Sequence, residues 1–183
     1  MEKTSRINRG LTQQIYLLEK ISNLEYKVMG TSGKPYIITI AKHPKCTCPD
    51  HFIRHKRCKH IYFVLIRIMN VADPEKKEYS EENIAEMINN IPAMVDIFSN
   101  DRIYIKKHSD EIDVADKIVE PKIDDNCPIC LDDVKTQPFQ YCCKCGKCVH
   151  IECMNMWIKH GKKENKCIYC KNKHFIDLSI KKN

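Results

Sequence analysis

The stretch "CTCPDHFIRHKRCKH", residues 46–60, places three cysteines and a histidine in two close pairs. The pairs are Cys46-x-Cys48 and Cys58-x-His60, with nine residues between them. Thiolate and imidazole are the ligands that zinc prefers in tetrahedral structural sites. The spacing therefore predicts one zinc ion held by these four residues.

Upstream of this stretch, the sequence predicts a helix followed by a β-hairpin. Apolar residues recur every three or four positions, as on one face of a helix, at Leu11, Ile15, Leu18, Ile21 and Leu24. The segments "EYKVMG" (25–30) and "PYIITIA" (35–41) are rich in β-branched and aromatic residues, and "TSGK" between them favours a turn. The hairpin leads directly to Cys46.

Downstream, Pro49 and Asp50 favour a turn, and "CKHIYFVLIRIM" predicts a helix from about Lys59. Its inward positions are Ile61, Val64, Leu65 and Ile68. The metal would tie the hairpin to this helix. A module of this size buries too little apolar surface to offset its chain entropy, so metal binding would supply its folding free energy.

The twelve cysteines suit either disulfides or metal sites. The first residues, "MEKTSRINRG", lack the apolar core of a signal peptide, which favours a reducing, intracellular location in cytoplasm or nucleus and therefore zinc. The most apolar run, "IYFVLIRIM", is too short to span a bilayer and contains Arg67, so no membrane partner is expected.

The formal net charge of +7 is unevenly distributed. Residues 1–70 carry 13 basic and 4 acidic side chains, residues 71–126 carry 7 and 15, and residues 127–183 carry 11 and 5. Ten zinc-bound thiolates and three zinc ions would change the total to roughly +3 (7 − 10 + 6). Charge alone is therefore a weak argument for a nucleic-acid partner.

The acidic segment 71–126 predicts a partly helical connector. Asp73-Pro74 favours a turn, and Ser80 stands where a helix N-cap is expected, followed by two glutamates. The apolar face of that helix would be Ile84, Met87, Ile88 and Ile91, and Pro92 would start a second turn or helix. We expect a strand at "RIYIKK" (102–107) and a tether over residues 108–126.

The segment 127–174 contains four further ligand pairs, and residues 175–183 form a basic tail. The pairs are Cys127-x2-Cys130, Cys142-x2-Cys145, His150-x2-Cys153 and Cys167-x2-Cys170. In a cross-brace, alternate pairs share a metal, so the first and third pairs would bind one zinc and the second and fourth another. Cys143 and Cys148 are surplus, and either could replace Cys142 or Cys145.

Residues 24–70 resemble the SWIM zinc finger, because the hairpin is followed by "CTCPDHF" and "CKHIYFVL". The second module is similar to both the RING finger and the PHD finger. PHD fingers carry a tryptophan two residues before the seventh ligand, where this chain has Asn165, whereas Trp157 lies where RING fingers often place theirs. "CPIC" and "CMNMW" also look like RING.

These resemblances imply small α+β zinc-stabilised modules: a SWIM finger of hairpin, zinc knuckle and helix, then a cross-brace RING finger. A RING finger implies a ubiquitin ligase that holds a ubiquitin-charged conjugating enzyme near a protein substrate, without catalytic residues of its own. Matched to the family, the residues that contact the conjugating enzyme are Ile129, Trp157, Ile168 and Lys171. Lys171 replaces a frequent arginine, and RING fingers often form homo-oligomers.

SWIM fingers are associated with protein and nucleic-acid partners. In this chain the candidates for contacting nucleic acid are Phe52, Arg54, Lys56 and Arg57. The simpler alternative is a solvated charged loop, and for Trp157 a core residue that packs its helix. The alternative function is a non-enzymatic zinc adaptor that binds nucleic acid or reads a histone tail.

Overall fold

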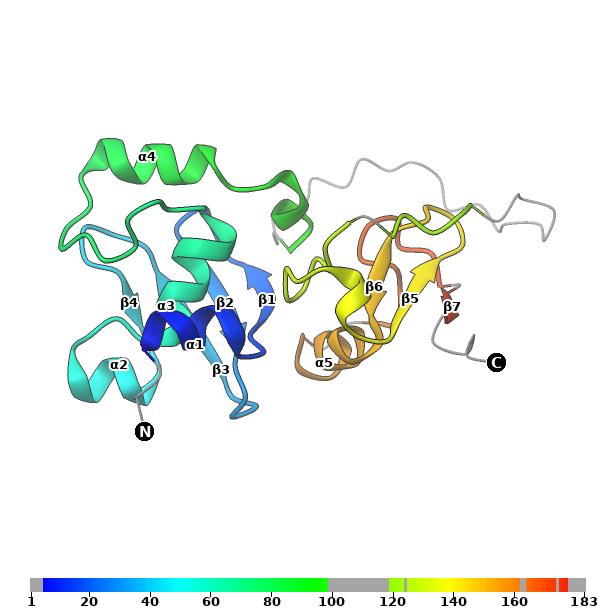
Figure 1. Cartoon of the computed structure of the whole chain (residues 1–183), viewed down its shortest axis with the longest axis horizontal. Helices are drawn as coiled ribbons and strands as arrows, with labels where there is room; N and C mark the ends of the chain where they lie inside the picture. The colour runs from blue at the N-terminus through cyan, green and yellow to red at the C-terminus, as the bar shows by residue number, and fades with distance from the viewer. Residues whose placement is uncertain (1–4, 99–118, 124, 162–163, 174, 178–183) are drawn as a thin grey trace. The chain divides into compact units, whose positions relative to one another are not determined.

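The chain divides into two compact units, unit 1 (residues 1–100) and unit 2 (residues 101–183), which Figure 1 shows. The computed structural model describes residues 5–98, 119–123, 125–161, 164–173 and 175–177. Each unit contains one antiparallel sheet, with four strands in unit 1 and three in unit 2. The expected small α+β architecture is therefore confirmed.

The sheet of unit 1 is built in chain order. Its strands are β1 (Tyr16–Lys20), β2 (Glu25–Met29), β3 (Pro35–Thr39) and β4 (Lys45–Cys46). The predicted hairpin is confirmed, since Val28 of β2 pairs with Tyr36 of β3. The helical elements are α1 (Arg6–Thr12), α2 (Pro49–Arg54), α3 (Lys59–Phe63), π-helical η1 (Val64–Ile68), α4 (Glu81–Asn89) and the 3-10 helix η2 (Ala93–Phe98).

The single helix expected over residues 11–24 is wrong. Helix α1 ends at Thr12, and β1 follows from Tyr16. Residues 15–18 are all buried, and consecutive strand residues point to opposite sides, so both faces of β1 are covered. A strand buried on both faces forms a continuous apolar run without alternation, and here the run coincides with helical spacing.

The segment after Cys48 forms a short helix instead of the expected turn. Cys48 has extended backbone at the N-cap of α2, and Pro49 occupies the first helical turn, where its missing N–H costs nothing. His55 ends the helix in the left-handed conformation, with φ of 52°.

The helix predicted from Lys59 is confirmed as α3, continued by η1. Its four predicted inward residues, Ile61, Val64, Leu65 and Ile68, are fully buried. Helix α1 packs against α3 (Figure 1), and Gly10 makes this approach possible because a Cβ there would lie 2.9 Å from the Lys59 carbonyl oxygen. The helix that begins at Lys59 is therefore held between the sheet and α1.

Residues 71–98 belong to unit 1 and pack onto its sheet and central helix region. The Arg57 guanidinium donates to the carbonyls of Pro74 and Lys76 and lies 4.9 Å from the centre of the Tyr79 ring. The Tyr79 amide donates to the Lys42 carbonyl at 3.0 Å. The first part of the expected connector is thus fixed to the rest of unit 1, and Arg57 contributes several of the contacts.

Helix α4 begins as predicted. Ser80 is its N-cap and forms a reciprocal capping box with Asn83. On the predicted apolar face, Met87 is buried and Ile84, Ile88 and Ile91 are half-buried. The second helix expected after Pro92 is η2, which contacts β1.

Unit 2 consists of η3 (Val134–Thr136), β5 (Phe139–Cys142), β6 (Cys148–His150), α5 (Ile151–Gly161) and β7 (Phe175–Asp177). The strand order is β6-β5-β7. Three buried residues, Val134, Tyr141 and Cys148, form a core against which Phe139 and Ile176 pack. The first residues of the expected tail therefore complete the sheet.

The expectation of a tether over residues 108–126 is wrong for its last part, which packs against the rest of unit 2. The Val119 amide donates to the Cys143 carbonyl at 2.9 Å, and the Lys122 amide donates to the Gly146 carbonyl at 2.8 Å. Lys147 forms an ion pair with Asp125 at 2.6 Å. Residues 119–123 and 125 thus brace the Cys142–Cys148 loop, whereas the strand expected at 102–107 and the tether expected over 108–118 lie outside the described residues.

Candidate metal centres

The structure groups the twelve predicted ligands into three clusters, and in each the four candidate ligand atoms lie within 4.8 Å of one another. We call them site 1 (Cys46, Cys48, Cys58, His60), site 2 (Cys127, Cys130, His150, Cys153) and site 3 (Cys142, Cys145, Cys167, Cys170). All twelve cysteines carry free thiols. The predicted pairing of alternate ligand pairs in unit 2 is the one observed.

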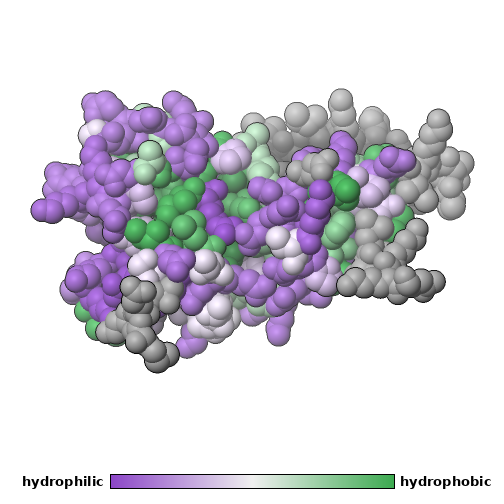
Figure 2. Space-filling view, viewed as in Figure 1, coloured by the Kyte–Doolittle hydropathy of each residue, from purple (hydrophilic) through white to green (hydrophobic). Residues whose placement is uncertain are grey.

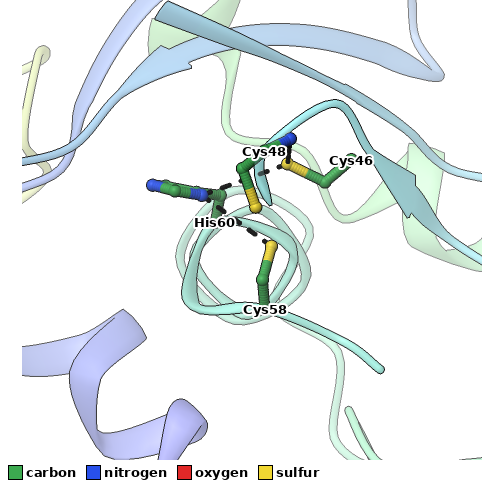
Figure 3. Close-up of side chains that lie close together, drawn as sticks. All are labelled: Cys46, Cys48, Cys58 and His60. Atoms are coloured by element: carbon green, nitrogen blue, oxygen red, sulfur yellow. Dashed lines mark hydrogen bonds between the residues drawn. The ribbon is translucent and has the colours of Figure 1, made fainter. Parts of the chain in front are cut away.

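Site 1 joins the sheet of unit 1 to its central helix. Cys46 lies at the end of β4, Cys48 at the N-cap of α2 and Cys58 at the N-cap of α3. Figure 3 shows the three sulfurs and the His60 ring turned toward one another. His60 Nδ1 lies 3.8 Å from the Cys58 sulfur and 4.0 Å from the Cys46 sulfur.

These distances are within a few tenths of an ångström of those in tetrahedral zinc sites. With zinc–sulfur bonds of about 2.3 Å and zinc–nitrogen bonds of about 2.0 Å, neighbouring ligand atoms should be separated by roughly 3.5–3.8 Å. In site 3 the sulfur–sulfur distances are 3.5 Å and 3.7 Å. In site 2, His150 Nδ1 lies 3.3 Å from Cys130 and 3.6 Å from Cys153. All three clusters can therefore hold a zinc ion.

Unit 2 presents its cysteine pairs on three similar loops. Each Cys-x2-Cys pair is followed by a residue with left-handed backbone: Leu131, Gly146 and Lys171, with φ of 64°, 72° and 64°. The amide of that residue donates to the carbonyl of the first cysteine at 2.8–2.9 Å. Two non-glycine residues thus adopt an unfavourable conformation, which the surrounding structure must enforce. The shared geometry turns both sulfurs of each pair toward one point.

His150 is held in the tautomer that binds metal. Its Nε2 lies 3.1 Å from the Val134 carbonyl oxygen and 3.2 Å from the Asp133 carbonyl oxygen. Because carbonyls only accept, Nε2 carries a proton, and Nδ1 faces the three cysteines of site 2 as the nitrogen that would bind metal.

His60 has a different environment. Its Nε2 is buried and has no hydrogen-bond partner among the described residues, and its ring lies 5.0 Å from the Tyr36 ring, centre to centre. A Cβ added to Gly30 would lie 2.8 Å from this Nε2. The His60 ring is therefore positioned by packing, and Gly30 provides the space it occupies.

The thiols of all three sites differ in acidity. A hydrogen bond with Cys46 lowers the pKa of the Cys58 thiol to about 4, and one with Cys167 lowers the pKa of the Cys145 thiol to about 5. Burial raises the pKa of Cys127, but hydrogen bonds with Cys130 and Cys153 outweigh it and leave the pKa well below its usual value. Each site thus favours one thiolate, the form that binds metal.

The two surplus cysteines lie outside the sites. Cys148 is buried in the core of unit 2, where its sulfur packs with Val134 and Tyr141. Cys143 is half-buried, and its carbonyl accepts the Val119 amide. The sequence leaves open which two of four cysteines bind, and in the structure Cys142 and Cys145 are the two in site 3.

The candidate partner-binding residues fall into two classes. Ile129, Trp157 and Ile168 are buried, with exposed fractions of 0%, 6% and 2%. Lys171 is exposed and donates to the Ile168 carbonyl at 3.0 Å. In unit 1, Phe52, Arg54 and Lys56 are exposed, whereas Arg57 is engaged with residues 74–79.

Sequence reasoning missed the residues that surround the ligands. Gly30 ends the strand "EYKVMG", and a glycine there signals close approach of another group, but the sequence does not say which. The contacts of Val119 and Lys122 with the Cys142–Cys148 loop have no sequence signature. These residues lie far from their partners along the chain.

We expect Gly30→Ala to weaken zinc binding at site 1. The added methyl group would displace the His60 ring, so about one zinc ion should be lost per chain under competition with a chromophoric chelator while two remain. Gly33→Ala is the matched control: its φ of 68° costs an alanine about 1–2 kcal/mol, yet no atom lies within 4 Å of the new Cβ. Equal zinc retention by Gly30→Ala and wild type would contradict the prediction.

None of the helices in the described residues has the length and apolar character needed to cross a membrane. Comparison of the chain with protein-family models, curated proteins and solved structures gave no match.

Proposed function

We propose that the chain is a RING-type ubiquitin ligase in which unit 2 binds a ubiquitin-conjugating enzyme and unit 1, a SWIM-like finger, binds another partner. The observation that carries the proposal is the interleaving of the ligand pairs in sites 2 and 3 around β5, β6 and α5, with Trp157 on that helix. In this proposal the protein makes no covalent bond with ubiquitin. It orients the charged conjugating enzyme, and the gain in rate comes from positioning.

The environments of the two cysteines outside the metal sites support a mechanism without a covalent ubiquitin–cysteine intermediate on this chain. Of the two cysteines outside the metal sites, Cys148 is buried and burial raises its pKa to about 11, so it would be a poor nucleophile. The Cys143 backbone braces the metal loop. Neither is assigned a role in transfer.

The proposed contact with the conjugating enzyme is made by the exposed Lys171, and by Ile129, Trp157 and Ile168 where binding uncovers these buried side chains. The Trp157 indole Nε1 is buried and has no hydrogen-bond partner among the described residues. An unpaired buried donor costs about 1–3 kcal/mol, and an acceptor on a bound protein would remove this cost once the side chains over the indole move aside. The burial of Trp157 also agrees with a role in packing α5, so the test must separate binding from folding.

Lys171 allows binding to be tested separately from folding, because its side chain is exposed. Its ammonium keeps the charge of the frequent arginine but lacks the planar fork that holds two acceptors at once. Lys171→Arg is expected to raise the transfer rate about fivefold, since the second hydrogen bond adds roughly 1 kcal/mol. Lys171→Ala should lower the rate by a similar factor.

The experiment measures discharge of ubiquitin from a panel of charged conjugating enzymes onto free lysine, with zinc-loaded full-length protein. Trp157→Phe, which keeps an aromatic ring but removes the N–H, should slow discharge without loss of zinc. If no conjugating enzyme in a broad panel is discharged by protein that retains three zinc ions, the proposal is rejected. Equal rates for the Lys171 variants would reject the assigned contact.

A further inference from the structure

A shallow groove of about 460 Å³ lies beside site 1, between the edge of the sheet and α2. Residues from β3, β4 and α2 and the loops after them line it: Ile37, Thr39, Lys45, Cys46, Thr47, His51, Phe52 and His55. The Phe52 side chain is 76% exposed and Ile37 is 40% exposed. On the visible face of unit 1, Figure 2 shows a largely hydrophilic surface around α2 with a small hydrophobic area.

The groove combines an aromatic face with positive charge. Lys45 lines it, and Arg54 and Lys56 follow Phe52 on and just after α2. From residue 26 to residue 72 the sequence contains nine lysines and arginines and a single acidic residue, Asp50. Asp50 pairs with Arg6 at 3.0 Å and with Arg54 at 3.2 Å, so its negative charge is compensated, and the Arg54 side chain remains 63% exposed.

The polar groups of the groove leave hydrogen-bonding capacity for a ligand. His51 Nδ1 lies 2.9 Å from the Lys56 carbonyl oxygen and donates to it, so Nε2 is the ring nitrogen left for a ligand. Lys56 extends from the same loop, and its side chain is exposed. The groove thus offers a flat aromatic surface, a ring nitrogen and one lysine, with two further cations close by on the α2 segment.

We propose that this groove binds single-stranded nucleic acid, with a base stacked on Phe52 and the phosphates contacted by Lys45, Arg54 and Lys56. Bases present a flat π-face whatever their identity, and an exposed aromatic next to cations is the arrangement that nonspecific single-strand binding uses. Arg57 is excluded from this contact because it is held by residues 74–79. The proposal is independent of the ligase activity proposed for unit 2.

A protein segment with acidic and apolar side chains is the competing occupant, and the chemistry of Phe52 distinguishes the two. Phe52→Leu keeps most of the apolar surface but removes the π-face, whereas Phe52→Tyr keeps the ring. Stacking contributes about 1–3 kcal/mol per base, so Phe52→Leu should weaken nucleic-acid binding about tenfold and Phe52→Tyr should not. An apolar contact would distinguish the two variants far less.

The experiment titrates zinc-loaded full-length protein into a fluorescein-labelled oligothymidine or oligouridine of about 12 nucleotides and follows fluorescence anisotropy. Ile53→Ala is the matched control, because Ile53 is 72% exposed on the same helix but does not line the groove. Affinity falls as salt rises, and Lys45→Gln should make the plot of log affinity against log salt less steep by about 0.7, the value for one single-strand phosphate contact. Lys34→Gln, in the β2–β3 turn, should leave the slope nearly unchanged.

The expected result is binding that Phe52→Leu weakens, that Phe52→Tyr and Ile53→Ala retain, and that salt weakens. A flat titration at low salt would overturn the proposal, as would equal losses for Phe52→Leu and Ile53→Ala. Equal affinities of Phe52→Leu and Phe52→Tyr would also overturn it. Ubiquitin discharge, measured on the same variants, should be unaffected, so failure of this proposal and failure of the ligase proposal give different results.

Discussion

Removal of zinc is expected to unfold both units. A structural zinc ion contributes on the order of 10 kcal/mol of binding free energy, which is comparable to the whole stability of a typical domain, about 5–15 kcal/mol. Site 1 is the junction of β4, α2 and α3. In unit 2, site 2 has ligands on β6 and α5, and site 3 has a ligand on β5.

The measurement uses a strong chelator with circular dichroism and with the fluorescence of Trp157, the single tryptophan of the chain, which reports on unit 2 alone. The helical signal and the Trp157 emission should both change to those of an unfolded chain, and added zinc should restore them whereas magnesium should not. Elemental analysis of the folded protein should give three zinc ions per chain. A native spectrum at far less than one ion per chain would show that the fold does not depend on metal.

The second large effect is expected from Gly146→Ala. Gly146 has φ of 72°, which costs an alanine about 1–2 kcal/mol, and the new Cβ would lie 2.4 Å from the Glu120 carbonyl oxygen. That oxygen belongs to a backbone that cannot rotate away, because Val119 and Lys122 on either side are hydrogen-bonded to the same loop. The total loss should be about 3 kcal/mol or more.

Urea unfolding followed by Trp157 fluorescence measures this loss, together with zinc retention at site 3. Lys171→Gly is the control: it occupies the equivalent position in the other loop of site 3, with φ of 64°, so glycine there should relieve strain and leave stability unchanged or slightly raised. If Gly146→Ala unfolds at the wild-type urea concentration, residues 119–122 are not packed against the metal loop as described.

The ligand set was predictable from sequence because metal chemistry restricts both residue type and spacing. The hairpin, the helix from Lys59 and the Ser80 cap were predictable because their signals are local. The identity of β1 was not, since a strand covered on both faces loses the alternation that distinguishes it from a helix. The groove beside site 1 is lined by Ile37 from β3 and Phe52 from α2, and no local sequence pattern indicates that these two residues come together.

The interleaved ligands of unit 2 impose an order on its assembly as the chain emerges from the ribosome. Site 1 has all its ligands once His60 has been made, and site 2 once Cys153 has been made. Cys142 and Cys145 are synthesised before site 2 is complete, yet they must wait for Cys167 and Cys170. During that interval the nascent polypeptide carries two ligand thiols without their metal beside a site that is already complete, and these thiols are open to oxidation.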